Sequence, residues 1–293
     1  MPKILRNIPA SGLSVCVKRR RHRAMLIRAG YNIAYECSAE TPMLLMLHLR
    51  PERLPDLQTP ETFAVEPYVS YSNYFDSFGN FCTQLVAPPG RIAFSNDFLI
   101  ADSGEPDVFP IYGRQHPVGE LPHDVLIFLL GSRYCETDRL SDLAWALFGA
   151  IEPGWPRVKA IMDYAHSRIE FGYKYARSTK TAWEAHDEGR GVCRDYAHLA
   201  ITLCRCMNIP ARYCTGYLGD IGVPFDPNPM DFSAWFDVYL SGGWHTLDAR
   251  HNKPRIGRIL MARGRDATDT AISTAFGSAE LVNFLVVTEE IES

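Results

Sequence analysis

The stretch GRGVCRDYAHLAITLCRCMNIPARYCTGY, residues 189–217, predicts an apolar helix followed by a strand. From Cys193 to about Met207, apolar residues recur at helical spacing on several sides, which indicates a helix buried from more than one direction. Asn208 and Pro210 are typical of a helix end, and the residues after them are typical of a strand. A central helix leading into a strand therefore organises the second half of the chain.

The first residue of this helix, Cys193, raises a chemical question. Gly189 and Gly191 give the backbone before it the freedom to turn tightly. The positive end of a helix dipole and the free backbone N–H groups of a first turn favour a thiolate, and those N–H groups can also receive an oxyanion. These properties predict a nucleophile. A buried core cysteine that happens to begin a helix is the structural alternative.

The remaining chain predicts a β-rich part, then helices, then antiparallel strands. Residues 30–105 alternate between apolar and polar side chains, as strands do. We expect helices at 140–148, 156–169, 181–188 and 193–207, followed by strands at 211–219, 233–240, 244–250 and 280–290. This order is typical of an α+β fold and not of an alternating βαβ fold.

Three segments follow from this order. Residues 1–24 contain the basic run KRRRHR and are predicted to be a disordered tail. Residues 25–133 are predicted to form a β-rich N-terminal domain, whose last part, 106–133, is a linker rich in Pro and Gly. Residues 134–293 are predicted to form the core domain.

Composition argues against several classes of partner. The formal net charge of -4 offers no basic excess for nucleic acid. The longest apolar run, residues 42–49, is too short to span a bilayer.

We find no secretory signal pattern, and the eight cysteines lack regular paired spacing, so reduced thiols in the cytoplasm are expected. Cys204 and Cys206 point about 200° apart on a helix and cannot grip one metal ion together.

The stretches SAWFDVYL and WHTLDAR predict a hairpin. A two-residue turn would pair Leu240 with Gly243. In that register Ser233 lies near Arg250, and Asp248 lies diagonally on the same face. A three-residue turn would reverse this relation, so the prediction depends on the turn type.

From about residue 155 to 256, the chain resembles the transglutaminase-like superfamily. The resemblance rests on a Cys that opens a central helix, a Gly-Tyr strand, an Ala-Trp strand and a Trp-x-x-Leu-Asp strand, in that order. It implies a papain/transglutaminase-like core, a central helix packed on an antiparallel sheet, and the β-rich part resembles the N-terminal region of bacterial homologues. It also implies that Cys193 is the nucleophile, that Asp248 orients the base, and that the family's histidine position falls on Ser233.

Ser233 is a departure from the family pattern, because a hydroxyl cannot take a thiol proton near neutral pH. His251, at the end of the Asp248 strand, is our first candidate for a replacement base, and His186 on the preceding helix is the second. His198 lies about 140° round the central helix from Cys193. His245 points away from Asp248 in the two-residue-turn register.

Two classes of function remain open. The first is a cysteine-dependent enzyme that transfers acyl groups or hydrolyses amide or peptide bonds, with His251, His186 or water as the base and Tyr173 or Tyr175 as a second oxyanion donor. The second is a catalytically impaired binding or scaffolding protein, which Ser233 favours. The expected partner is a peptide or protein amide, with no nucleic acid, no membrane, no cofactor and no metal. The oligomeric state is left open.

Overall fold

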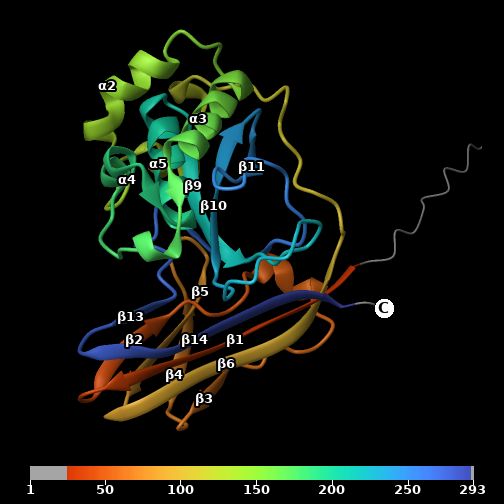
Figure 1. Ribbon diagram of the computed structural model, residues 1–293, viewed down its shortest axis with the longest axis vertical. Coiled ribbons are helices and arrows are strands. Elements are labelled where there is room, and N and C mark those ends of the chain that lie inside the picture. The colour runs from red at the N-terminus through yellow and green to blue at the C-terminus, as the bar shows by residue number, and fades with distance from the viewer. Residues whose placement is uncertain (1–24, 292–293) are drawn as a thin grey trace, which may run out of the picture.

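The computed structural model describes residues 25–291, with a β-sandwich at one end and a group of helices around a separate antiparallel sheet at the other (Figure 1). The predicted basic tail, residues 1–24, lies outside the described residues. Helices and antiparallel sheets together confirm the α+β fold class.

The sandwich consists of two four-stranded antiparallel sheets. The first has the strand order β14-β1-β6-β3 and the second has the order β13-β2-β5-β4. The strand bounds are β1 Met25–Cys37, β2 Thr41–Leu45, β3 Ala64–Glu66, β4 Tyr71–Phe75, β5 Phe81–Ala87, β6 Gly90–Asp102, β13 Ser273–Ala275 and β14 Ala279–Ile291.

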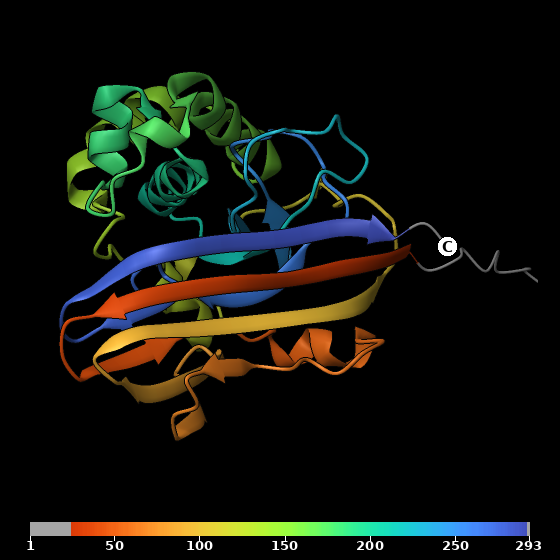
Figure 2. The ribbon, with the colours of Figure 1, turned by 60° about the horizontal axis from the view of Figure 1, so that its bottom comes forward.

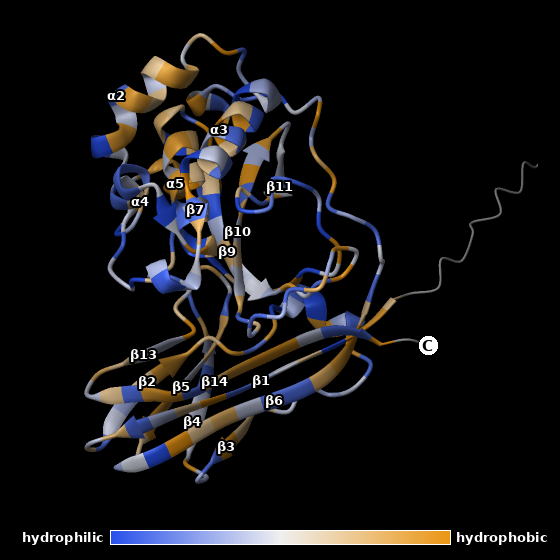
Figure 3. Ribbon diagram, viewed as in Figure 1, coloured by the Kyte–Doolittle hydropathy of each residue, from blue (hydrophilic) through white to orange (hydrophobic). Residues whose placement is uncertain are grey.

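The alternation of side chains along β1 explains why this region folds as a sandwich. Ile27, Ala29, Tyr31, Ile33 and Tyr35 all lie in one apolar cluster, as the two-residue period of a strand requires. Figure 2 shows the three long strands β14, β1 and β6 side by side, and Figure 3 shows the alternating apolar and polar bands along β6. The expected β-rich region is confirmed.

The C-terminal strands belong to this sandwich. β14 pairs antiparallel with β1 from Leu26–Ile291 to Cys37–Ala279, and β13 pairs with β2. The sequence interpretation had placed all of 134–293 in the core domain, and the pairing corrects this for residues 273–291. Without β14, the long β1 would present an unpaired edge to solvent. No local pattern in a sequence shows which distant strand covers such an edge.

Four helices form most of the other end: α2 Thr137–Phe148, α3 Trp155–Arg168, α4 Ala182–Glu188 and α5 Cys193–Cys206. All four lie where the sequence predicted them. α5 contacts α2, α3 and α4 as well as strands β9 and β10 of the adjacent sheet. Every residue of α5 from Asp195 onward is buried. The helix is therefore held from all sides, which fixes the position of its first turn.

The sheet behind α5 has the order β11-β10-β9-β12. Its bounds are β9 Ala211–Tyr217, β10 Ser233–Leu240, β11 Gly243–Leu247 and β12 Ile259–Gly264, of which β12 was not predicted. Leu240 pairs with Gly243, so the predicted two-residue turn is confirmed. The β10–β11 ladder ends at Phe236–Leu247, before Ser233 and Arg250, although both of these residues line one cleft.

The expected linker at 106–133 is partly helical, and Leu121 and Val125 pack against Tyr239 of β10. The short elements of the chain are η1 Pro51–Asp56, η2 Val118–Glu120, α1 His123–Leu126, η3 Ile127–Leu129, β7 Glu170–Phe171, η4 Tyr173–Tyr175 and β8 Arg190–Gly191. No helix within residues 25–291 has the length and apolar character needed to cross a bilayer.

Candidate active site

The first turn of α5 is built around Asp195. Its Oδ2 accepts a hydrogen bond from the backbone N–H of Val192 at 2.9 Å, which satisfies one of the free donors at the helix start. Gly191 is required beside it, because a Cβ there would lie 2.5 Å from Asp195 Oδ2. This capping contact holds Cys193 at the first position of the helix.

Cys193 lies in a polar cleft of about 60 Å³. Six of the seven cysteines in the described residues are buried, whereas Cys193 is partly exposed. The walls come from three places: η4, the loop between β9 and β10, and the segment after β11. They are lined by Tyr173, Leu218, Asp220, Asp226, Asn228, Pro229, Met230, Asp231, Phe232, Ser233, Arg250, His251 and Arg255.

The surroundings of the thiol correct the expectation of a thiolate. Burial of the sulfur raises the pKa of Cys193 to about 11, and the carboxylate of Asp231 acts in the same direction. Arg250 and the backbone N–H of Ala234 lower this pKa, but by less. The start of a helix does not by itself make this thiol acidic, so its chemistry requires a base.

The structure places Asp248 immediately beyond the end of β11, buried and fully hydrogen-bonded. Its Oδ1 accepts the backbone N–H of His251 at 3.0 Å, and its Oδ2 accepts His251 Nδ1–H at 2.8 Å and Arg258 Nη2–H at 2.9 Å. Burial alone would raise the pKa of Asp248, but Arg258 and His251 hold it well below its usual range. The carboxylate is therefore ionised and can only accept hydrogen bonds.

The ionised carboxylate of Asp248 fixes the tautomer of His251, which is a neutral imidazole. Because Asp248 only accepts, Nδ1 of His251 carries the proton and Nε2 keeps its lone pair. Burial lowers the pKa of His251, and the pairing with Asp248 opposes that effect without reversing it. The ring lines the same cleft as Cys193. The sequence-predicted residues Cys193, Asp248 and His251 are thus brought to one place.

Ser233, on which the resemblance places the family's histidine position, also lines this cleft. It is the first residue of β10 and is 6% exposed, and its Oγ has no hydrogen-bond partner among residues 25–291. The next residue, Ala234, supplies the backbone N–H that acts on the Cys193 thiol. The departure from the family pattern therefore lies beside the nucleophile position.

The other histidines lie elsewhere. His186 Nε2 forms a 2.8 Å hydrogen bond with Tyr164 Oη and does not line the cleft. His245 Nε2 contacts the carbonyl of Leu240, and His245 does not line the cleft. His198 is fully buried on α5. Of the two replacement bases considered from the sequence, the structure brings only His251 to the cleft.

Sequence reasoning did not single out Arg250, Asp231 or Arg258 as site residues. Arg258 Nε also pairs with Asp107 at 2.8 Å, so a residue of the expected linker helps to hold Asp248 in place. Arg250 lies close to Asp248 in the sequence, and this proximity could have identified it as a site residue. Nothing in the sequence placed Asp107 or Asp231 near the cleft, because both lie in loops. Within residues 25–291, no group of three or more His, Cys, Asp or Glu side chains is arranged to hold a metal ion.

Comparisons with known proteins agree with this geometry. The profile of the transglutaminase-like superfamily matches residues 144–249. The crystal structure of a candidate cysteine protease from Cytophaga hutchinsonii is 30% identical, with a TM-score of 0.77 over 92% of this chain and 92% of that one. The uncharacterized protein ML0607 of Mycobacterium leprae is 30% identical over 120 residues, which cover 39% of this chain and 42% of that protein. The chain belongs to the transglutaminase-like superfamily, and the predicted fold is confirmed.

Proposed function

We propose that this protein is a cysteine-dependent enzyme that hydrolyses amide or peptide bonds or transfers their acyl groups. Cys193 is the nucleophile, His251 is the general base and acid, and Asp248 orients the imidazole. The observation that carries this proposal is the 2.8 Å bond from His251 Nδ1 to Asp248 Oδ2 at the cleft that Cys193 lines. It supplies an oriented base although the family's histidine position holds Ser233.

The proposed reaction follows from the protonation states of these groups. His251 Nε2 takes the proton of Cys193 as the sulfur attacks the amide carbonyl. Cys193, whose pKa is high, therefore does not need to ionise to a free thiolate before the attack. The backbone N–H at the start of α5 stabilises the oxyanion, and Tyr173 Oη is a second donor from the cleft wall. The imidazolium then gives its proton to the leaving amine. Water or an acceptor amine, which loses its proton to His251, attacks the thioester carbonyl; the C–S bond breaks, the acyl group leaves, and His251 returns the proton to Cys193.

A test compares single variants in a panel of peptide amides that report both ammonia or amine release and acyl transfer. We expect Cys193→Ala and His251→Ala to abolish turnover, and His186→Ala to retain it, because His186 lies outside the cleft. Full activity in His251→Ala would contradict the assignment of the base.

A second candidate function is a binding protein that keeps the cleft without efficient chemistry. Two observations favour it: Ser233 replaces the family's histidine, and the pKa of Cys193 is raised to about 11. Peptides that bind the cleft with equal affinity in wild type and Cys193→Ala, with no turnover in either, would support this second function.

We further infer that the protein works on a peptide or protein amide in the cytoplasm. Seven cysteines in the described residues are free, which suits a reducing compartment. The mild net charge supports neither nucleic acid nor an anionic membrane surface as a partner. Localisation of a tagged full-length chain by cell fractionation tests this inference.

A further inference from the structure

Arg250 is a cation in the cleft with no anion assigned to it. Its guanidinium lies over the ring of Phe171 at 3.7 Å and lines the cleft beside Cys193. Among residues 25–291, no carboxylate lies within ion-pair distance of Arg250, although Asp226 and Asp231 line the same cleft. Stacking on an aromatic ring positions a guanidinium and leaves the N–H donors of the guanidinium free for a ligand.

The other charges of the cleft are already engaged within the protein, with one exception. Asp220 accepts the backbone N–H of Asp226, and Asp226 accepts both N–H groups of Asn228. Arg255 donates to the carbonyl of Gly219. The exception is Asp231, which lines the cleft and makes no ion pair within the described part of the chain.

Two buried donors that line the cleft also lack a partner. Ser233 Oγ and Arg255 Nε have no hydrogen-bond partner among residues 25–291, although these residues are 6% and 4% exposed. A buried donor without an acceptor costs free energy comparable to a lost hydrogen bond, so native proteins rarely leave one unexplained. Both residues line the cleft, where a ligand with acceptor oxygens would satisfy them.

We propose that the cleft takes an anionic substrate, an amide or peptide whose own carboxylate lies within a few bonds of the attacked carbonyl and is bound by Arg250. Ser233 Oγ and Arg255 Nε complete the set of donors. A guanidinium fork matches a carboxylate with two parallel hydrogen bonds, and this pairing is stronger and more directional than one with a neutral amide. The inference rests on the proposed function, because it places the anion relative to the Cys193 nucleophile.

Two alkylating reagents of nearly equal size test this proposal without a known substrate. Iodoacetate carries a carboxylate where iodoacetamide carries a neutral amide, and both react with a thiol at the same carbon. The rate of each is measured on Cys193 by peptide mass mapping in a Cys16→Ser background. We expect the iodoacetate-to-iodoacetamide rate ratio to fall roughly tenfold in Arg250→Gln, as loss of a nearby opposite charge predicts, and to fall less in Arg250→Lys.

Two further variants serve as controls. Arg139 also places its guanidinium over an aromatic ring, Trp183, at 3.6 Å but lies outside the cleft, so Arg139→Gln should leave the rate ratio unchanged. Asp231→Asn removes a repelling charge and should raise the ratio about two- to threefold. Near-UV circular dichroism confirms that each variant is folded.

The outcomes separate this inference from the proposed function. An unchanged ratio in folded Arg250→Gln overturns the anionic substrate and leaves Cys193 and His251 in their roles. In His251→Ala, both reagents should slow by the same factor, so the ratio stays constant. If neither reagent slows in His251→Ala, the proposed base is wrong, while the ratio in Arg250→Gln still decides the role of Arg250.

Discussion

Two histidine–aspartate groupings lie around α5, and they differ in access to solvent. His251 and Asp248 lie at the cleft near the start of the helix, with one ring nitrogen bonded to the carboxylate and the other free. His198 lies on the buried part of the helix and Asp266 lies on the segment after β12, and both residues are at most 1% exposed. The same residue types therefore occur in an open and in a sealed setting of one fold.

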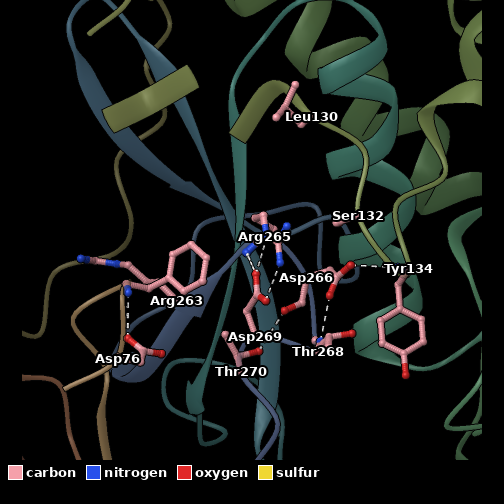
Figure 4. Close-up of polar contacts among 12 residues, drawn as sticks. Asp76, Leu130, Ser132, Tyr134, Arg263, Arg265, Asp266, Thr268, Asp269 and Thr270 are labelled. Atoms are coloured by element: carbon pink, nitrogen blue, oxygen red, sulfur yellow. Dashed lines mark hydrogen bonds and ion pairs between the residues drawn. The ribbon is translucent and has the colours of Figure 1, made fainter. Parts of the chain in front are cut away.

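In the sealed grouping, both Asp266 and His198 accept hydrogen bonds from the backbone. Asp266 accepts the backbone N–H groups of Tyr134 and Thr268, both at 2.8 Å, and Figure 4 shows it between them. His198 Nε2 accepts the N–H of Ala267, and its ring lies 5.1 Å from the ring of Tyr134. Burial lowers the pKa of His198, so the ring is neutral.

The comparison teaches that a histidine beside an aspartate is not in itself a catalytic unit. In the sealed grouping, the ring nitrogen that could act as a base already accepts a backbone hydrogen bond, and the histidine is fully buried. In the open grouping, Nε2 of His251 accepts no hydrogen bond from any residue between 25 and 291. A structural histidine therefore differs from a candidate base in two ways: its burial, and the hydrogen bond that its second ring nitrogen already accepts.

The largest expected effect is on turnover at the cleft. Cys193→Ala should reduce turnover by about 1000-fold or more and change the stability less than loss of a fully buried cysteine does, because residue Cys193 is only partly buried. Cys204→Ala, on the buried part of the same helix, should instead lower the free energy of unfolding by about 1 kcal/mol and leave turnover intact. Steady-state kinetics measures the turnover of both variants, and urea unfolding measures their stability. Equal losses of turnover in the two variants would contradict this prediction.

The same substitution in both groupings gives the next largest effect. Asp248→Asn should lower turnover by about 100-fold or more, because an amide no longer dictates the His251 tautomer. Asp266→Asn should leave turnover within about threefold but destabilise the fold by about 2–4 kcal/mol, since a buried acceptor of two N–H bonds is compromised.

These two variants are measured side by side by kinetics and chemical unfolding. A loss of turnover in folded Asp266→Asn as large as that in Asp248→Asn would mean that the sealed grouping acts on the chemistry. The distinction between an open catalytic pair and a sealed structural one would then be wrong.

A smaller effect is expected in the pH dependence of Cys193 alkylation, which tests whether His251 acts as the base. His251 acts as a base only when unprotonated, and its pKa lies below the ordinary 6.5. Alkylation of Cys193 by iodoacetamide should therefore be level from about pH 7 to 8 and fall only as the pH drops below that lowered value. In His251→Gln, the rate should rise about tenfold per pH unit, as for a thiol with a pKa of about 11. The same slope in wild type and variant would exclude base assistance.

The smallest effect is expected at the family's histidine position. Ser233→His should not increase turnover, because His251 already supplies the base, and the larger ring should cost about 1–3 kcal/mol at a site that is only 6% exposed. Ser233→Ala is the matched control for the loss of the hydroxyl alone. A gain of turnover in Ser233→His would instead favour the binding or scaffolding function for the natural chain.

Much of the fold was predictable because its signals are local. The helices at 137–206 follow from apolar spacing along one helix face, and the strands of the sandwich follow from alternation. The hairpin register followed from the Ser241-Gly242 turn, whose positive φ angles of 51° and 81° suit a two-residue hairpin. The order of motifs around Cys193 and Asp248 was sufficient to predict the family.

Other features depended on contacts between distant segments. β12 and the pairing of β14 with β1 were not predicted, because strand neighbours are chosen by the edges that remain to be covered. The pKa of Cys193 was expected to be lowered and is raised, because the helix start is a local feature whereas desolvation depends on everything packed around the sulfur.

The amino-acid sequence by itself determined the secondary structure, the family and the residues Cys193 and Asp248, since periodic burial and motif order are written along the chain. Only the tertiary structure decided that His251, and not His186, lies at the cleft, that Arg250 and Asp231 flank the thiol, and that Asp107 supports Arg258 from another segment. Distance, burial and the pKa values they set are properties of the packed molecule, because they arise between atoms far apart in the chain.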